Sequence, residues 1–422
     1  MPAADACPGI LDLHEARDGY VARIRLPGGY ATGSRLRGLA ALASQFGNGC
    51  VDLTARGNVQ IRGVAADDAT GLARRAASAG LLPSPAHDRA RNITASPLAG
   101  LAGHPDLRRL VVAVDRALRA DPSLAALPGR FLFSLDDGTG RAGLSGCDVG
   151  LRWHPRGSDL ILAGRETGLR GPADRGVAQA ITAARAFLGQ RRAALAAAGP
   201  ASTGPASTRI ADLPDGGAAV AAAVGGVLGD KVTDIPGRLP LGALLDPGVA
   251  LLDPGVDCAP VAVVAAPLAR LTARQLRLLG RMLRPGETAR LAAAGRVVLP
   301  LAGPVDAGLA ELADADLIVS GEHILSAVTA CSGMSCARSL ADVRSLAGRV
   351  PGLATGFAGL GPVHWAGCGR RCGLPADATA VVAMSADQFM IAGGPVLSIT
   401  VPGSPVPGSP VPGTLTAAAG PA

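Results

Sequence analysis

The chain has 422 residues, which is too long for one ordinary domain of roughly 100–200 residues, so several folded units are expected. Apolar residues make up 48% of it, but only 6 Phe, 2 Trp and 2 Tyr are present, which argues against a nucleic-acid platform built on base stacking. The formal charge of +7 is carried by arginine, with Lys231 as the only lysine, and does not by itself indicate a polyanionic partner. We expect no nucleic-acid partner.

The compartment is predicted from segments of unusual composition. The longest run of small residues, Gly216–Gly229, is shorter than the roughly 20 apolar residues of a membrane helix, so we expect no membrane contact. Residues 1–19 carry acidic side chains and lack a basic start followed by an apolar stretch, which predicts a cytoplasmic protein. Eight cysteines are too sparse for a disulfide scaffold, so close pairs among them are expected to bind metal or serve redox chemistry.

The first predicted elements are a helix and a hairpin. Apolar residues recur at helical spacing over residues 34–46, and Gly47-Asn48-Gly49 supplies a left-handed stop. Residues 51–54 and 59–62 then alternate apolar and polar side chains on either side of a turn. This pattern predicts an amphipathic helix followed by a β-hairpin with one polar face.

A longer mixed segment follows, over about residues 91–189. Within it, residues 151–153 and 160–162 are predicted as strands and residues 177–188 as a helix. The sequence Gly-Pro-Ala-Ser-Thr then occurs twice over residues 199–208, a composition typical of a flexible connection. We therefore expect the main domain boundary there.

The second half repeats the organisation of the first. A predicted helix over residues 271–282 precedes residues 291–299, which align with residues 53–61, and another mixed segment follows over about residues 317–400. The polar side chains of the first hairpin are lost in the second copy, so one hairpin is expected to bind a ligand and the other to pack. The replacements are Arg56 by Ala294, Gln60 by Val298 and Arg62 by Pro300. The whole predicts an α+β protein with a pseudo-twofold duplication.

Four cysteines form the strongest candidate site. Cys331 and Cys336 are separated by four residues, and Cys368 and Cys372 by three, with 31 residues between the two pairs. Four thiolates suit either an iron–sulfur cluster or a structural zinc ion, and the spacing leaves both open. His364 precedes the second pair and is expected to be a packed histidine rather than a ligand. The remaining cysteines, which receive no role, are Cys7, Cys50, Cys147 and Cys258.

Arginines form a second candidate site. Guanidinium groups make paired hydrogen bonds with carboxylates, so several on one surface suit a ligand with many carboxylates. The alternative is a solvated strand face, which a chain this rich in arginine also favours. The candidate substrate-binding residues are Arg56, Arg62, Arg91 and Arg130.

Three motifs together resemble the nitrite and sulfite reductase superfamily. They are the hairpin 53–62, the segment 91–100 that begins Arg-Asn-Ile-Thr, and the paired cysteines that include 364–368. Within the superfamily, residues 6–9 and 363–373 are most similar to the precorrin-3B synthase family. The resemblance covers about residues 6–190 and 258–395.

The resemblance implies paired ferredoxin-like half-domains, each followed by a cluster or tetrapyrrole domain. It also implies that Cys331, Cys336, Cys368 and Cys372 carry a [4Fe-4S] cluster, and that Arg56, Arg91 and Arg130 hold carboxylates of a tetrapyrrole. The expected division is half-domain one (1–75), a tetrapyrrole-binding α+β domain (85–195), a linker region (196–250), half-domain two (255–310), a cluster domain (317–400) and a disordered tail (401–422).

Two departures from the reductases bear on the expected activity. Reductases separate the first two cysteines by five residues, and they place a second lysine where this chain has Leu132. We therefore expect an enzyme, an oxygen-dependent iron–sulfur monooxygenase that converts precorrin-3A to precorrin-3B by hydroxylation and lactone formation in aerobic cobalamin synthesis. Alternatives are a sirohaem-dependent nitrite or sulfite reductase and a non-catalytic tetrapyrrole-binding protein.

Further cofactors follow from the same resemblance. The synthase family is described with a mononuclear non-haem iron, but no carboxylate–histidine triad is visible in this sequence, and no catalytic residue is assigned. The sequence also lacks a glycine-rich dinucleotide motif that opens a β–α unit. NADH is therefore expected as the ultimate electron source, acting through an electron-donor protein.

Overall fold

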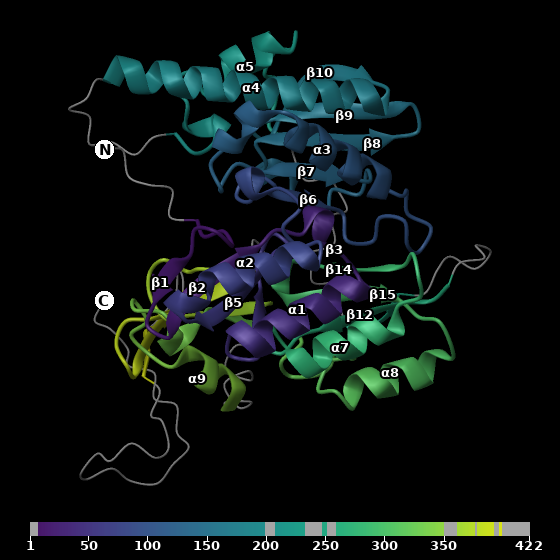
Figure 1. Cartoon of the computed structure of the whole chain (residues 1–422), viewed down its shortest axis with the longest axis vertical. Helices are drawn as coiled ribbons and strands as arrows, with labels where there is room; N and C mark the ends of the chain where they lie inside the picture. Colours follow the sequence, from purple (N-terminus) through teal and green to yellow (C-terminus); the bar gives the residue numbers. More distant parts are fainter. Residues whose placement is uncertain are drawn as a thin grey trace, which may run out of the picture.

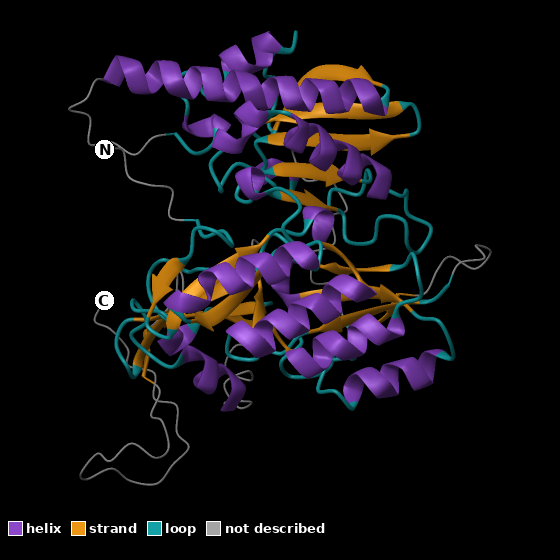
Figure 2. Ribbon diagram, in the orientation of Figure 1, coloured by secondary structure: helices purple, strands orange, loops and turns teal. Residues whose placement is uncertain are grey.

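In the computed structural model, the described residues form four five-stranded sheets, named A to D here (Figures 1 and 2). Sheet C and its helices form an upper body in Figure 1, and sheets A, B and D lie below it. The described residues are 7–198, 207–232, 247–250, 259–349, 361–375, 378–391 and 396–398. The predicted tail at 401–422 and most of the Gly-Pro-Ala-Ser-Thr repeat lie outside them.

Sheets A and B are antiparallel and have the same strand order. Sheet A runs β1 (His14–Ala16), β2 (Gly19–Ile24), β5 (Val59–Val64), β4 (Cys50–Leu53) and β13 (Arg270–Thr272). Sheet B runs β11 (Gly248–Ala250), β12 (Val261–Ala265), β15 (Arg296–Pro300), β14 (Thr288–Leu291) and β3 (Tyr30–Thr32). Their helices are α1 (Gly33–Phe46), α2 (Ala69–Ser78), α7 (Ala273–Met282) and α8 (Val305–Ala313).

The two halves exchange a strand. β3 comes from the first half but pairs with β14 of the second, and β13 comes from the second half but pairs with β4 of the first. The predicted duplication is therefore confirmed, but the expected half-domains over 1–75 and 255–310 are interleaved rather than separate.

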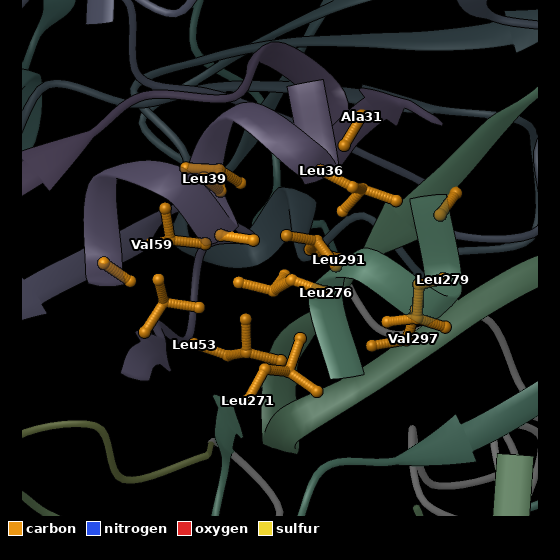
Figure 3. Packing of buried hydrophobic residues seen from close by; sticks show 14 of the residues in the cluster. Ala31, Leu36, Leu39, Leu53, Val59, Leu271, Leu276, Leu279, Leu291 and Val297 are labelled. Carbon is orange, nitrogen blue, oxygen red and sulfur yellow. The ribbon is translucent and has the colours of Figure 1, made fainter. Parts of the chain in front are cut away.

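The helices that follow the exchanged strands begin in the same way. The hydroxyl of Thr32 accepts a hydrogen bond from the Arg35 N–H, and the hydroxyl of Thr272 accepts one from the Gln275 N–H. Such threonine caps satisfy backbone donors that a first helical turn leaves without partners. α1 and α7 then pack side by side on the inner faces of both sheets (Figure 3).

One hydrophobic core joins the two half-domains. Leu36 and Leu39 of α1 meet Leu276 and Leu279 of α7 in the same buried cluster (Figure 3). Alternate residues of sheets A and B fill the rest of this core, as a period of two requires for a sheet with one buried face. The opposite, outer faces of the two sheets are thus free to carry other chemistry.

Sheets C and D also share one topology. In each, three parallel strands are followed by two antiparallel ones. Sheet C contains β6 (Ile93–Ala95), β7 (Phe133–Asp136), β8 (Val149–His154), β9 (Gly157–Leu162) and β10 (Arg165–Gly171), with α3 (Arg108–Ala120) and α4 (Ala173–Ala198). Sheet D contains β16 (Val328–Ala330), β17 (Val363–Ala366), β18 (Thr379–Ala383), β19 (Gln388–Ile391) and β20 (Val396–Ser398), with α9 (Val343–Arg349).

The predicted linker over 196–250 is too long. α4 continues to Ala198, and the chain beyond the repeat packs back on sheet C through α5 (Ala218–Ala223). Ile210 and Val220 are fully buried in that core, so they belong to the sheet C body.

The left-handed stop predicted within Gly47-Asn48-Gly49 is confirmed, since Gly49 has a φ of 81°. One local prediction needs correction. Leu271 lies in β13, so the predicted helix over 271–282 begins two residues later, at Ala273. Within the described part of the chain, no helix is both long and apolar enough to cross a membrane.

Candidate functional site

The outer face of sheet A carries a row of polar side chains that crosses four strands. Arg23 on β2 is opposite Gln60 on β5, and Gln60 is opposite Asp52 on β4. Asp52 in turn faces Arg270 on β13, whose guanidinium donates bonds of 2.6 and 3.1 Å to the Asp52 carboxylate. The Gln60 amide oxygen accepts from Arg23 in the amide orientation that satisfies both groups. The predicted polar hairpin face therefore exists and is larger than the hairpin itself.

The tip of the β4–β5 hairpin is fixed against sheet C by two asparagines. The Asn58 amide donates to the Asn92 side-chain oxygen at 3.0 Å, and the Asn92 amide donates to the Phe131 carbonyl at 3.1 Å. Both asparagines are buried, so these bonds have few competing water molecules. The docking places Arg56, at the tip, beside the β6–β7 end of the upper body.

Arg56 lines an open pocket of about 60 Å³ between the hairpin tip and sheet C. Its guanidinium donates to the Arg130 carbonyl at 3.1 Å, while burial and the nearby Arg209 lower its pKa to about 10. The side chain therefore stays cationic at neutral pH. Further lining residues are Gly28, Gly29, Gly57, Thr94, Pro97, Arg141 and Ala292.

Arg141 is a pocket residue that the sequence analysis missed. It lies on the loop after β7, which the buried carboxylate of Asp136 holds through bonds from the N–H groups of Gly138, Gly140 and Ala142 at 2.8 to 3.0 Å. The available signal was the Asp-Asp-Gly-Thr-Gly turn after a strand, because ligands gather at the carboxyl ends of parallel strands.

The four predicted substrate arginines have different surroundings. Arg56 lines the pocket, and Arg130 is exposed next to it. Arg91 is buried and its Nε lies 2.6 Å from the Asp115 carboxylate. Arg62 pairs with Asp18 at 2.9 Å and donates to the Ser335 carbonyl at 2.7 Å. The structure thus brings Arg56 and Arg130 together and gives Arg91 and Arg62 internal partners.

The four predicted cysteines lie on two loops at the carboxyl ends of the parallel strands β16 and β17. The pKa of Cys372 is raised by burial and by the negative charge of Cys368, Cys331 and Cys336. The Gly367 N–H of the second loop donates to the Cys331 sulfur of the first at 3.2 Å, so the two loops lie side by side. That all four thiols bind one cluster stays a prediction.

Backbone donors face the cysteine group. The N–H groups of Gly333 and Gly367 donate to the Cys331 sulfur at 3.4 and 3.2 Å. His364 is buried and bonds Thr329 through Nδ1 at 2.9 Å and the Cys372 carbonyl through Nε2 at 3.1 Å. Burial lowers the His364 pKa to about 4. The histidine therefore holds the second cysteine loop and is not directed at the sulfurs.

Thiol side chains are ligands of iron–sulfur clusters and of zinc ions alike. Among the described residues, no three His, Cys, Asp or Glu side chains are grouped closely enough to hold a metal ion in the present arrangement. Four thiols with N–H donors to sulfur are the surroundings that stabilise such a cluster.

The cysteine loop rests on the polar face of sheet A. Besides the bond from Arg62 to Ser335, the Arg17 N–H donates to the same carbonyl at 3.2 Å. Arg344 donates to the Cys331 carbonyl at 3.2 Å, and burial lowers its pKa to about 10. One hairpin therefore contacts both parts of the candidate site, the pocket through Arg56 and the cysteine loop through Arg62.

Comparison with known proteins agrees with this arrangement. Residues 14–79 match the family described as nitrite/sulfite reductase ferredoxin-like half domain. The chain contains such a half domain. The match spans β1 to the end of α2, so the half domain supplies the hairpin that carries Arg56 and Arg62. The predicted resemblance to the superfamily is confirmed.

Relatives of the half domain include two kinds of enzyme. A ferredoxin–nitrite reductase of Leptolyngbya laminosa is 35% identical over 120 residues, which is 26% of this chain and 24% of that protein. A precorrin-3B synthase of a Sinorhizobium species is 38% identical over 69 residues, 16% of this chain and 15% of that protein. The matched segments thus span a quarter or less of these relatives. These similarities support an oxidoreductase.

A solved structure extends the likeness to most of the fold. The structure of the Mycobacterium tuberculosis NirA protein matches with a TM-score of 0.66, 21% identity, and coverage of 84% of this chain and 69% of that one. At this identity the likeness concerns the fold alone. It shows that the α+β arrangement with ferredoxin-like half-domains is shared beyond residues 14–79.

Proposed function

We propose that the protein is a precorrin-3B synthase, an oxygen-dependent monooxygenase that converts precorrin-3A to precorrin-3B. The observation that carries the proposal is the β4–β5 hairpin, which presents Arg56 to an open pocket and bonds the cysteine loop through Arg62. A carboxylate-rich macrocycle and a redox centre would thus be held by one rigid element. The similarity to a precorrin-3B synthase over 69 residues supports the same assignment.

Leu132 separates this proposal from an anion reductase. It occupies the place where the reductase pattern has a second lysine, it is buried, and its N–H donates to the Asp148 carboxylate at 2.8 Å. An apolar side chain there offers no charge to a small anion such as nitrite or sulfite.

The proposed reaction balances with one external reductant. One atom of dioxygen enters precorrin-3A as a hydroxyl group, and a carboxylate of the substrate adds to a ring carbon and closes the lactone without loss of water. The other atom leaves as water after taking up two electrons and two protons. NADH supplies both electrons and one proton through a donor protein, and the solvent supplies the second proton. The cluster, held by Cys331, Cys336, Cys368 and Cys372, would supply one-electron transfer when bound.

The protein's own residues bind and orient the substrate. Arg56 remains charged at neutral pH and can bind a carboxylate at the pocket, with Arg141 and the exposed Arg130 close by. Several fixed cations restrict the rotation of a macrocycle better than one can, and this fixes which ring carbon meets the oxidant. The N–H groups of Gly333 and Gly367 would stabilise charge on the sulfur of Cys331.

The second candidate is a sirohaem-dependent nitrite reductase. It is favoured by the longer match to ferredoxin–nitrite reductases, 120 residues against 69. The two functions exclude each other at the Arg56 pocket, because bound sirohaem would take the place and the arginines that precorrin-3A needs.

The test uses protein purified and reconstituted without oxygen. Iron and acid-labile sulfide are measured with the visible spectrum, and the protein is then assayed for oxygen uptake with precorrin-3A and for reduction of nitrite and sulfite. The proposal expects a cluster without sirohaem, and oxygen uptake that depends on precorrin-3A. A strong sirohaem band with six-electron reductase activity would favour the second candidate, and zinc in place of iron would reject both.

A further inference from the structure

Arg290, on β14 of sheet B, is a buried cation that lacks a carboxylate partner. Only 2% of the surface of the residue is exposed. Within the described residues, its guanidinium makes no ion pair. Its donors bond neutral oxygens of Thr288 and of Ala99, while its Nε has no hydrogen-bond partner. Isolated buried charges are costly, so native proteins pair them with an opposite charge.

The matching pair of side chains in sheet A contains a carboxylate, which the pair that includes Arg290 lacks. Asp52 on β4 corresponds to Arg290 on β14, and the exchanged strands place Arg270 opposite Asp52 but Tyr30 opposite Arg290. The Arg270 guanidinium is bonded to a carboxylate, whereas the Arg290 guanidinium lies over the Tyr30 ring, 5.0 Å from its centroid. A ring face attracts a cation weakly and does not neutralise it.

An open cavity reaches this cation. It has a volume of about 260 Å³ and is lined by Arg290, Thr288, Gly100 and Arg108, and none of its lining residues belongs to the Arg56 pocket. Arg108 is the second cation at its wall, with a side chain that is 46% exposed and paired with Asp106. The one carboxylate among the described lining residues, that of Glu287, accepts a bond from the Arg284 N–H at 2.8 Å.

We propose that this cavity is a second anion site, which binds the carboxylate or phosphate group of a small ligand against Arg290. The anion would be attracted by the positive charges of Arg290 and Arg108 at the cavity wall. The proposal does not depend on the reaction catalysed at the Arg56 pocket, because the two cavities share no lining residue.

The first experiment measures thermal unfolding of the full chain during titration with inorganic phosphate or with acetate, at constant ionic strength. At least one of the two anions should raise the unfolding temperature of the unaltered protein in a saturable way. Arg290→Met should weaken the apparent affinity roughly tenfold or more, as expected for the loss of a charge-assisted hydrogen bond. Phosphate alone would indicate a phosphate ligand, and acetate alone a carboxylate ligand.

Two further variants keep the test decisive. Arg192→Met removes an exposed cation of α4 that lines neither cavity and should leave the affinity unchanged, so a loss there would overturn the assignment. Arg108→Gln alters the cavity mouth at a half-exposed side chain and should weaken binding several-fold even if Arg290→Met does not fold. Unchanged binding in both cavity variants, or no saturable effect of either anion, would also overturn it.

Discussion

Sheets A and B have the same strand order, yet their outer faces carry opposite chemistry. The row across sheet A is polar and is covered by the cysteine loop, which bonds it through Arg62. The row across sheet B is mostly apolar and is covered by Leu98 and Leu101 from the loop after β6. The two rows, in matching order, are Arg23, Gln60, Asp52 and Arg270 in sheet A, and Val263, Val298, Arg290 and Tyr30 in sheet B.

The covering loops also correspond residue by residue. Ser96 follows β6 and its N–H donates to the Leu135 carbonyl, just as the N–H of Cys331, which follows β16, donates to the Trp365 carbonyl. The Ser96 hydroxyl accepts from the N–H of Asp137 at 3.1 Å, whereas the Cys331 sulfur accepts from the N–H of Gly367 at 3.2 Å. Ser96 thus occupies the place that Cys331 has in the other loop.

Sheets A and B thus have the same architecture but contact their covering loops through different chemistry. Where the loop carries thiols, the sheet beneath it keeps arginine and carboxylate side chains, and Arg62 bonds the loop. Where the loop carries leucines, the sheet beneath it is valine-rich and the contact is hydrophobic. Arg290 is the exception in the apolar row, which is why its missing counterion is informative.

Removal of a thiol should have the largest effect. Cys368→Ala should reduce the iron content from about four atoms per chain to near zero and abolish redox activity, because four thiolates hold a cluster. Iron and sulfide analysis measures this. Cys147→Ala is the matched control: Cys147 is buried beside sheet C, and burial raises its pKa to about 12, so its loss should leave iron unchanged. Full iron retention in Cys368→Ala would contradict the cluster assignment.

The second-largest effect should follow removal of the Asp52 carboxylate from the polar row of sheet A. Asp52→Ala leaves the Arg270 guanidinium without its partner, and the two side chains are only 13% and 22% exposed. The free energy of unfolding should fall by about 2–3 kcal/mol, less than for a fully buried pair. Urea unfolding measures this, with Glu322→Ala in an exposed loop expected to change stability by less than about 0.5 kcal/mol. Equal effects would show that the pair does not stabilise sheet A.

Loss of the pocket arginine should weaken substrate binding without removing the cluster. Arg56→Ala should cost about 1–3 kcal/mol of affinity for the tetrapyrrole, since one charge-assisted bond is lost. Arg192→Ala, on the exposed side of α4, is the control with the same change in charge. Fluorescence quenching or calorimetry with the tetrapyrrole measures both. An affinity unchanged by Arg56→Ala would place the ligand elsewhere.

The smallest effect is expected at Tyr30 in alkaline solution. Burial raises its pKa to about 12 from the ordinary value of 10.0, so the folded protein keeps a proton that the unfolded chain loses. The contribution of Tyr30 to the free energy of unfolding therefore has its full value below pH 10. It falls by on the order of 1–2 kcal/mol as the pH rises from 10 towards 12. Tyr30→Phe should remove this part of the dependence, and parallel pH curves for the two proteins would refute it.

The sequence predicted the features that depend on local pattern. The period of two located both hairpins, and the alignment of residues 53–61 with 291–299 agrees with the observed pairs Leu53–Val59 and Leu291–Val297. The short spacing within each cysteine pair likewise placed both pairs on loops. Such signals extend over a few residues and need no knowledge of distant contacts.

Features that depend on distant partners were not predictable. The exchanged strands β3 and β13 have three residues each, too few for a period, and their partners lie more than 200 positions away. The neutralisation of Arg91 by Asp115 was also hidden, because a helix contact across 24 positions leaves no pattern in the sequence. Arg141 was missed because its loop has no regular structure.

The exchange of β3 and β13 gives the duplicated unit the construction of a domain-swapped dimer fused into one chain. Each half alone would expose the edge of β4 or β14 with unpaired backbone groups, which invites aggregation. Two fragments cut within residues 233–246, so that Ile210 and Val220 stay with the sheet C body, should therefore be poorly soluble when expressed separately but reassemble when produced together.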